Sequence, residues 1–259
     1  MGGPLRGIEG IDGLLLDVDG TLLQGEDPVP GAAALIAHLD SAGVPYRITT
    51  NITRLSRAAI AHHLRACGIA VSAGTILNPS VLARRRVLDS GDRRALLLVP
   101  ESSRIDFEGI DDDAGGAAWV IVGDLGRGFT RARLDPAFRR LRDGAALLAL
   151  HRGRYWLDPQ DGLVLDAGAF VAALEYAAGV TAQVIGKPSL EFFRLALQDL
   201  AVPPGSTLVV GDDLEADIGG GARAGCRTAL VKTGAWRSDR SQLGALRPDL
   251  LIDSVADLI

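Results

Sequence analysis

Short apolar runs alternate with amphipathic segments at both ends of the chain, and this alternation restricts the fold more than any other feature. Near the start, Gly13 to Leu16 and Pro45 to Thr49 are predicted strands, while residues 31–42 and 56–66 are predicted helices. Strands that alternate with helices in this way form a parallel sheet covered by helices. The sequence therefore predicts an α/β fold.

The same alternation returns after residue 184. Val184-Ile185 precedes a helix that runs to Leu200, with Ser189 as its predicted N-cap. The remaining predicted elements are strands at Thr207 to Val210, Arg227 to Val231 and Leu250 to Ile252, a helix at 214–224 closed by Gly225, and a last helix capped by Ser254. The two ends of the chain thus resemble halves of one sheet.

The middle of the chain has its own strand and helix signals. They comprise strands at Ala95 to Val99, Trp119 to Val122 and Ala146 to Leu150, and helices at 79–90, 134–142 and 168–178. We interpret this part as a separate lobe inserted into the first fold. The predicted division is a core of residues 1–78 and 184–259 and an inserted domain of residues 79–183.

Composition narrows the class of protein. The chain has 259 residues and a formal net charge of −5, which argues against a nucleic-acid binder that relies on overall positive charge. No apolar run approaches the length of a membrane span, and Met1 to Arg6 lacks the apolar stretch of a signal peptide. Cys67 and Cys226 fit no metal or redox motif, so reduced cysteines and a cytoplasmic location are expected.

The segment directly after the first strand, Asp17-Val18-Asp19-Gly20-Thr21-Leu22, carries the sharpest chemical signal. Two carboxylates this close are costly unless a cation neutralises them or one stays protonated. Gly20 allows the chain to turn sharply. A solvated Asp-Gly turn is the alternative, but ligands in open α/β sheets bind at the carboxyl ends of strands.

A second acidic cluster follows the predicted strand at 207–210. Asp212, Asp213 and Asp217 lie within Gly211-Asp212-Asp213-Leu214-Glu215-Ala216-Asp217. Asp213 could instead cap the next helix, and the negative charge of Asp217 could stabilise the first turn of that helix. Together the two clusters offer hard oxygen ligands, which suit Mg²⁺.

Two polar features could complete a phosphate site. Thr50 and Asn51 follow the second strand, and Lys187 offers a compact positive charge for a phosphate oxygen. A surface lysine before a helix is the alternative for Lys187. A Walker A loop is excluded because Thr181 stands where that motif needs glycine, and the four histidines have no zinc-binding spacing.

These segments, in this order, resemble the four motifs of the haloacid dehalogenase (HAD) superfamily. The motifs match at Asp17-x-Asp19-Gly20-Thr21-Leu22, Thr50-Asn51, Lys187 and Gly211-Asp212-Asp213-x-x-x-Asp217. The long insertion and the segments Gly186-Lys187-Pro188 and Val231-Lys232-Thr233-Gly234 are similar to subclass IIA, the 4-nitrophenylphosphatase and pyridoxal phosphatase group. Within it, the chain most resembles the branch of HAD-like domain-containing protein 2 and phospholysine phosphohistidine inorganic pyrophosphate phosphatase.

The resemblance implies a Rossmann-like core with an inserted α/β cap domain of type C2. It implies that Asp17 is the nucleophile that forms an aspartyl-phosphate and that Asp19 is the general acid and base. Mg²⁺ would be held by Asp17, by Asp212 and by a backbone carbonyl, that of Asp19, with Asp213 and Asp217 behind them.

By the same resemblance, Thr50, Asn51 and Lys187 would hold the phosphate oxygens. Ile52 departs from the pattern, because many relatives have a second polar residue there. The cap would set specificity. Its candidate contacts are Trp156, Arg152 and Arg154, for which a core aromatic and solvated arginines are the alternatives.

The implied function is a Mg²⁺-dependent phosphatase acting on a small phosphorylated metabolite, whether a phosphate monoester, pyrophosphate or an N-phosphorylated amino acid. A phosphotransferase or phosphomutase would share the aspartyl-phosphate, and a catalytically silent phosphate-binding scaffold would share the fold. Loss of Asp17 or Asp19 would signal such a scaffold, and both are present. The subclass also implies a homodimer formed through the cap. From the net charge and the lack of a membrane-length apolar run, we expect neither nucleic acid nor membrane as a partner.

Overall fold

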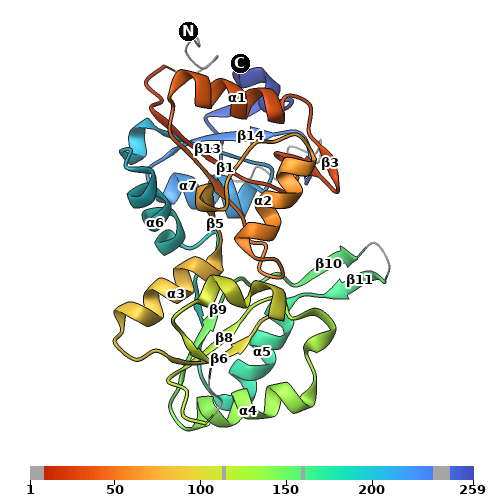
Figure 1. Cartoon of the computed structure of the whole chain (residues 1–259), viewed down its shortest axis with the longest axis vertical. Coiled ribbons are helices and arrows are strands. Elements are labelled where there is room, and N and C mark those ends of the chain that lie inside the picture. Colours follow the sequence, from red (N-terminus) through yellow and green to blue (C-terminus); the bar gives the residue numbers. More distant parts are fainter. Residues whose placement is uncertain (1–8, 113–114, 159–160, 236–245) are drawn as a thin grey trace. The chain divides into compact units, whose positions relative to one another are not determined.

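The computed structural model describes residues 9–112, 115–158, 161–235 and 246–259 (Figure 1). The predicted absence of a signal peptide concerns Met1 to Arg6, which lies outside the described residues. The chain divides into two compact units. The first comprises Met1–Thr50, Arg57–Leu77 and Lys187–Ile259, and the second comprises Asn51–Ser56 and Asn78–Gly186.

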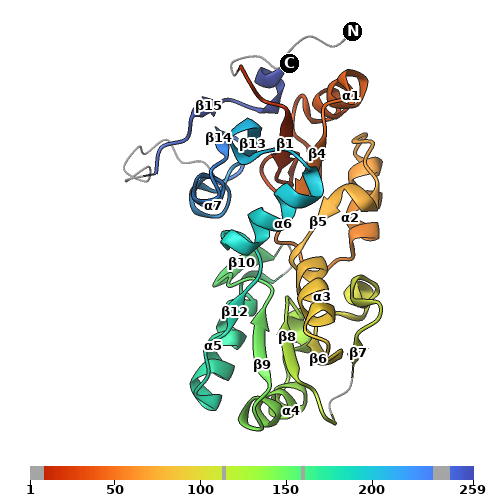
Figure 2. The ribbon, with the colours of Figure 1, turned by 90° about the vertical axis from the view of Figure 1, so that its left-hand side faces the viewer.

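The first unit is built on a six-stranded sheet in the order β15-β14-β13-β1-β4-β5, with every neighbouring pair parallel. Its strands are β1 (Gly13–Leu16), β4 (Tyr46–Thr49), β5 (Ile76–Leu77), β13 (Thr207–Gly211), β14 (Arg227–Val231) and β15 (Leu250–Ile252). Its helices include α1 (Ala32–Ala42), α2 (Arg57–Ala66), α6 (Leu190–Leu200) and α7 (Gly220–Arg223). Helices α2 and α7 lie on opposite sides of β1 (Figures 1 and 2).

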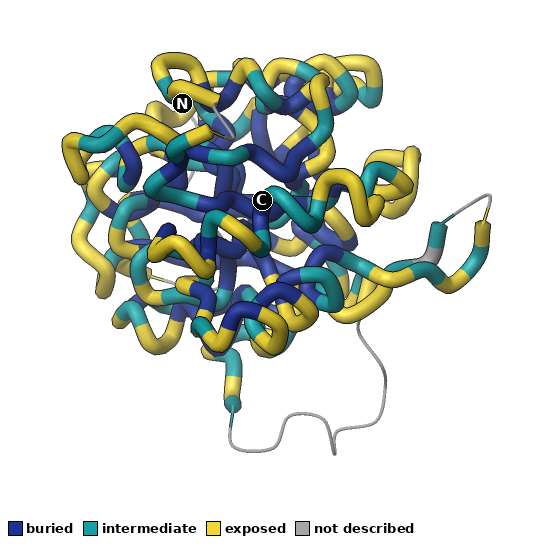
Figure 3. The backbone as a smooth tube through the Cα atoms, turned by 90° about the horizontal axis from the view of Figure 1, so that it is seen from below, coloured by how far each residue is buried: buried dark blue, intermediate teal, exposed yellow. Residues whose placement is uncertain are grey.

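The strands of this sheet are apolar because both faces are covered. All four residues of β1 are buried, and the tube in Figure 3 is dark blue along its interior strands. The helix ends follow local signals: Gly43 closes α1 in the left-handed conformation at φ 68°, and the Ser189 side chain accepts the Phe192 N–H at the start of α6. These elements confirm the α/β prediction.

The second unit has a parallel sheet of its own, in the order β12-β9-β8-β6-β7. Its strands are β6 (Arg94–Leu98), β7 (Asp111–Asp112), β8 (Trp119–Val122), β9 (Ala146–Ala149) and β12 (Gln183–Val184). Helices α3 (Pro79–Asp89) and α5 (Ala167–Ala178) lie on opposite sides of it, and α4 (Arg131–Arg142) packs beside α5 (Figures 1 and 2). A buried apolar cluster that includes Val122, Leu141 and Val171 fills the space between β8, α4 and α5.

Strands β10 (Tyr155–Asp158) and β11 (Gly162–Leu165) form an antiparallel hairpin that was not predicted from the sequence. The short pair β2 (Leu23–Gln24) and β3 (Asp27–Pro28) was not predicted either. A strand of two residues, such as β2 or β3, is too short to give an apolar period. Among the described residues, no helix has both the length and the apolar character needed to cross a membrane.

The predicted helix at 214–224 differs in detail. Residues Leu214–Gly219 form a π-helical turn, labelled η5, and only Gly220–Arg223 are α-helical. The wider turn arises because the Asp213 carbonyl accepts the N–H of Ile218, five residues on, at 3.2 Å. The hydrophobic periodicity of the sequence does not distinguish such a π-helical turn from a turn of α-helix.

The unit boundaries also differ from the predicted ranges. Residues 51–56 lie in the second unit, where the Thr53 hydroxyl accepts the backbone N–H of Asp124 at 2.8 Å. Residues 184–186 lie there as well, since Ile185 continues the hydrogen-bond ladder of β12 with the end of β9. These bonds join residues that are distant in sequence, so the local pattern does not reveal them.

Candidate active site

The candidate active site lies at the carboxyl ends of β1 and β13 in the first unit. Leu16 is opposite Val210 in the parallel register, so Asp17 and Asp212 follow the ends of neighbouring strands. The backbone N–H of Asp17 donates to the Val210 carbonyl at 2.9 Å and fixes the first residue beyond the strand. Sheet pairing therefore brings together two residues that are far apart in the sequence.

A tight turn follows Asp17 and shapes the floor of the site. The Val18 carbonyl oxygen accepts the backbone N–H groups of Thr21, Leu22 and Leu23, so it is engaged within the turn. Gly20 has a φ of 77°, and a Cβ atom there would overlap the Asp212 carboxylate. Only glycine combines this conformation with such a close approach.

Lys187 connects the two acidic segments. Its ammonium donates to Asp17 Oδ1 at 2.6 Å, to Asp217 Oδ1 at 2.6 Å and to the Thr49 carbonyl at 3.2 Å. Lys187, Asp17 and Asp217 are only 5%, 6% and 1% exposed, so these are buried ion pairs. The sequence alternative of a surface lysine is wrong, because Lys187 points inward.

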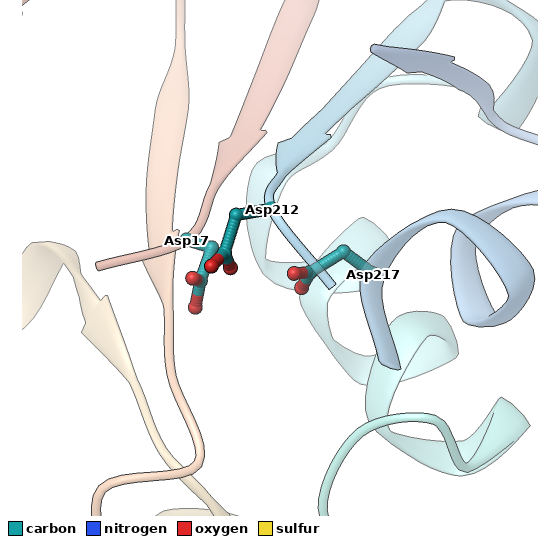
Figure 4. Close-up of side chains that lie close together, drawn as sticks. All are labelled: Asp17, Asp212 and Asp217. Carbon is teal, nitrogen blue, oxygen red and sulfur yellow. The ribbon is translucent and has the colours of Figure 1, made fainter. Parts of the chain in front are cut away.

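Three carboxylates converge at this point. One oxygen from each of Asp17, Asp212 and Asp217 lies within 4.8 Å of the other two, and Figure 4 shows Asp17 and Asp212 side by side with Asp217 facing them. The backbone N–H of Ala235 donates to Asp212 Oδ2 at 2.7 Å and holds that side chain in place. Asp217, which was expected behind the ligands, has a carboxylate oxygen in the same cluster.

The electrostatics of the cluster favour a cation. The pKa values of Asp17, Asp212 and Asp217 are raised from the usual 3.8 to about 7, mainly by burial and in part by neighbouring carboxylates, against the opposing effect of Lys187. Burial alone would lower the pKa of Lys187, but Asp17 and Asp217 together hold it above its ordinary value. Ionised carboxylates in this setting are costly without more positive charge.

The donor set fits a hard divalent metal ion. The three carboxylates and the single ammonium leave two negative charges uncompensated, which matches the charge of one divalent cation. Carboxylate oxygens are the preferred protein ligands of Mg²⁺ and Ca²⁺. The arrangement can therefore bind such an ion next to Asp17.

The remaining predicted site residues take different places. Asp213 caps η5, because its Oδ1 accepts the N–H groups of Glu215 and Ala216 at 2.8 and 2.7 Å, as the capping alternative predicted. Asp19 is exposed, and its charge contributes to the raised pKa of Asp17. Thr50 is buried in the first unit, where its N–H donates to the Leu77 carbonyl at 3.1 Å.

Asn51 belongs to the second unit and packs against Gly186 there. A Cβ atom on Gly186 would lie 2.6 Å from Asn51 Oδ1, so a larger residue could not occupy that position without movement. Gly186 directly precedes Lys187 in the chain. Two of the points where the chain passes from one unit to the other, after Thr50 and before Lys187, thus lie at predicted phosphate-binding residues.

The candidate cap contacts separate into two groups. Trp156 lines a pocket within the second unit, so it is not a core aromatic. Arg152 pairs with Glu175 at 2.7 Å, and Arg154 is exposed, as the solvated alternative predicted. Arg54, which was not predicted from the sequence, lies over the Trp156 ring, with its Cζ atom 3.9 Å from the ring centroid. Its only sequence signal was its place three residues after Asn51.

Comparisons with known proteins identify the family of the chain. A family model described as haloacid dehalogenase-like hydrolase matches residues 14–111, and one described as HAD-hydrolase-like matches residues 184–258. Phospholysine phosphohistidine inorganic pyrophosphate phosphatase of Bos taurus is 34% identical over 97% of this chain and 94% of its own length. Haloacid dehalogenase-like hydrolase domain-containing protein 2 of the same species is 38% identical over 87% of this chain and 85% of its own.

Solved structures show the same architecture. The crystal structure of 4-nitrophenylphosphatase from Thermotoga maritima superposes with a TM-score of 0.89 at 26% identity and covers 96% of both chains. The chain belongs to the haloacid dehalogenase-like hydrolase family. Within that family it is an enzyme of the phosphatase type, with a Rossmann-like core and an inserted α/β cap, so the predicted family and fold are confirmed.

Proposed function

We propose that this protein is a Mg²⁺-dependent phosphatase that hydrolyses a small phosphorylated metabolite through an aspartyl-phosphate on Asp17. The observation that carries the proposal is the buried cluster of Asp17, Asp212 and Asp217 joined by Lys187. Phosphate monoesters, pyrophosphate and N-phosphorylated amino acids remain the candidate substrates. The names of the relatives, a phospholysine phosphohistidine inorganic pyrophosphate phosphatase and a 4-nitrophenylphosphatase, support this range.

Asp17 is the proposed nucleophile because only one of its oxygens is engaged. Lys187 binds Oδ1, which leaves Oδ2 to attack phosphorus as the bond to the leaving oxygen breaks. With a pKa raised to about 7, Asp17 is partly protonated near neutral pH and is then a poor nucleophile. A bound Mg²⁺ would favour the ionised form and offset the charge of the phosphate.

Asp17, Asp212 and Asp217 are the side chains that would hold the ion, together with a backbone carbonyl. The Val18 carbonyl is engaged in its turn, which supports the carbonyl of Asp19 as that ligand. Asp217 also keeps the ammonium of Lys187 in position.

Asp19 is the proposed acid and base. It gives a proton to the leaving oxygen in the first step, and takes one from the water that attacks the aspartyl-phosphate in the second. Its exposure is consistent with exchange of protons with solvent. Lys187, Thr50 and Asn51 are proposed to bind the non-bridging oxygens as negative charge develops on them.

The decisive experiment measures phosphate release from a panel of substrates with Mg²⁺ and after chelation. The panel contains pyrophosphate, phosphohistidine, pyridoxal phosphate, sugar phosphates and nucleotides. We expect release with Mg²⁺ only. Full activity after chelation would contradict the metal site, and transfer of phosphate to an added alcohol in place of release would favour a phosphotransferase.

A homodimer through the second unit is a separate proposal. Tyr155, Leu163 and Leu165 of the β10–β11 hairpin are 61%, 69% and 65% exposed, which is unusual for large apolar side chains. We expect light scattering to give the mass of a dimer, and Leu163→Glu to give that of a monomer. The cytoplasmic location stays a prediction that cell fractionation would test.

A further inference from the structure

The second unit contains a pocket of about 480 Å³, and every residue that lines it belongs to that unit. Trp156 and Val164, which are direct cross-strand neighbours on one face of the β10–β11 hairpin, form part of its wall. Phe170 forms another part, and its ring stacks on that of Phe129 with the centroids 3.9 Å apart. The pocket is therefore preformed, and its apolar wall fits the body of a small organic molecule.

Arg54 lines this pocket and has unused donor capacity. Its Cζ atom lies 3.9 Å from the centroid of the Trp156 ring, and the Ser102 hydroxyl donates to its backbone carbonyl at 3.2 Å. Within the described ranges its guanidinium makes no hydrogen bond. The guanidinium donors form a planar fork that matches a carboxylate, and stacking lowers the conformational entropy that Arg54 would lose on binding one.

Asp124 offers a hydrogen-bond acceptor beside this fork. Its backbone N–H donates to the Thr53 hydroxyl at 2.8 Å, and its Oδ1 accepts the Gly126 N–H at 3.0 Å, so the side chain is held in place. Its Oδ2 lies 3.9 Å from Arg54 Nη1, beyond hydrogen-bond distance, and accepts no hydrogen bond from the part of the chain that the structure describes. Arg54 and Asp124 are thus a neighbouring donor and acceptor, each only partly used.

The charges of the pocket decide what kind of ligand fits. Two arginines and three aspartates line it, so its formal charge is negative by one. Arg127 is paired with Asp161, and Asp158 accepts the Asp161 N–H at 2.9 Å, so these three groups are already engaged. A simple anion would add to the excess negative charge, and a dianionic phosphate would add most. A simple cation would leave the Arg54 fork empty and would find one face of Trp156 covered.

We propose that this pocket binds a free amino acid with an apolar or aromatic side chain. The carboxylate of the amino acid binds Arg54, its ammonium binds Asp124 Oδ2, and its side chain packs against Trp156 and Phe170. Such a zwitterion uses both members of the loose Arg54–Asp124 pair and leaves the net charge of the pocket unchanged. The proposal concerns a ligand of the second unit alone and is independent of the proposed phosphatase function.

Calorimetry on the whole chain at pH 7.5 tests the site with named probes. The panel is L-phenylalanine, L-tyrosine, L-tryptophan, L-leucine, L-isoleucine and L-valine, and we expect at least one of them to bind with a Kd in the millimolar range or below. The tightest binder is then compared with its deaminated acid and with its amide. Each of these should bind at least about tenfold more weakly, because each lacks one of the two charged groups that the site recognises.

Variants assign the two ends of the ligand. Arg54→Gln removes the fork, and Asp124→Asn removes the negative charge but keeps Oδ1 for the Gly126 N–H. Each should weaken binding of the amino acid at least about tenfold. Asp124→Asn should also erase the preference for the amino acid over its deaminated acid, which general damage to the pocket would not do. Arg127→Gln is the matched control, since it removes the other arginine of the pocket and should keep the affinity.

Three outcomes would overturn the proposal. The first is that no member of the panel binds. The second is equal affinity for the amino acid and its deaminated acid, which would reduce the site to an anion site. The third is an equal loss in Arg54→Gln and Arg127→Gln, which would mean that net charge selects the ligand. Circular dichroism and thermal melting monitor the fold of each variant, and the comparison of ligands on the unsubstituted protein needs no variant.

Discussion

The two units hold their charged side chains in opposite ways. In the first, Asp17, Asp217 and Lys187 are almost fully buried and in direct contact. In the second, the Arg54 side chain is 45% exposed and lies 3.9 Å from its nearest carboxylate. Buried contacts perturb pKa values and favour a metal ion, whereas a loosely paired arginine can exchange partners. The proposed chemistry therefore lies in the first unit, and the second unit presents an arginine that can take another partner.

Asp17→Asn is expected to have the largest effect. An amide cannot attack phosphorus, so phosphate release should fall by at least about a thousandfold. The fold should persist, because the substitution removes a buried charge whose ionisation is already disfavoured. Circular dichroism and thermal melting monitor the fold.

The matched control for this substitution is Asp135→Asn on α4, whose side chain is 45% exposed beside Arg131. It should leave turnover unchanged. Normal turnover in a folded Asp17→Asn protein would contradict the assignment of Asp17 as the nucleophile. It would also contradict the contrast between the two units.

Asp19→Ala should have the next largest effect. Loss of a general acid costs about 10² to 10⁴ in rate, and the cost falls when the leaving group needs no proton. We therefore expect a severe loss with an alkyl phosphate and a small one with 4-nitrophenyl phosphate. Equal losses in kcat/KM for the two esters would exclude the proposed role of Asp19.

Two substitutions that each remove one positive charge compare the contribution of ion pairs to stability in the two units. Lys187→Met leaves Asp17 and Asp217 buried without their cation, and should lower the free energy of unfolding by about 3–5 kcal/mol. Arg152→Gln breaks a partly exposed pair with Glu175 in the second unit, and should cost less than about 1 kcal/mol. Urea unfolding at pH 7.5 measures both, and similar costs would refute the contrast.

The smallest expected effect is the pH dependence of the stability of the metal-free protein. The pKa values of Asp17, Asp212 and Asp217 rise on folding, so the metal-free native state binds more protons than the unfolded state between about pH 4 and 7. Their contribution to stability therefore falls as pH rises through this range and levels off above it. Lys187 adds no pH dependence to the stability in this range, because it is charged in both the native and the unfolded state.

Mg²⁺ competes with these protons, so it should raise the melting temperature more at pH 7.5 than at pH 5. Thermal melts with and without Mg²⁺ at both pH values test this. The Asp212→Asn variant should show a weaker dependence. A larger shift at pH 5 would contradict the assignment of the metal to this cluster.

Much of the first unit could be read from the sequence, because its signals are local. The apolar run before Asp17, the closing Gly43 and the Ser189 cap each depend on neighbours within a few residues. The order of the four motifs along the chain then indicated the haloacid dehalogenase family. The π-helical turn at Leu214–Gly219 and the short strands carried no comparable signal.

The sequence by itself determined which residues end the strands of the parallel sheet, and the resemblance carried by its motifs implied that Asp17 and Asp212 would be neighbours. Only the tertiary structure decided that Asp217 faces into the cluster, that residues 51–56 lie in the second unit and that Arg54 stacks on Trp156. The reason is physical. Strand ends follow from hydrophobic period and turn residues, whereas the direction of a side chain and its partner depend on contacts between segments far apart in the chain.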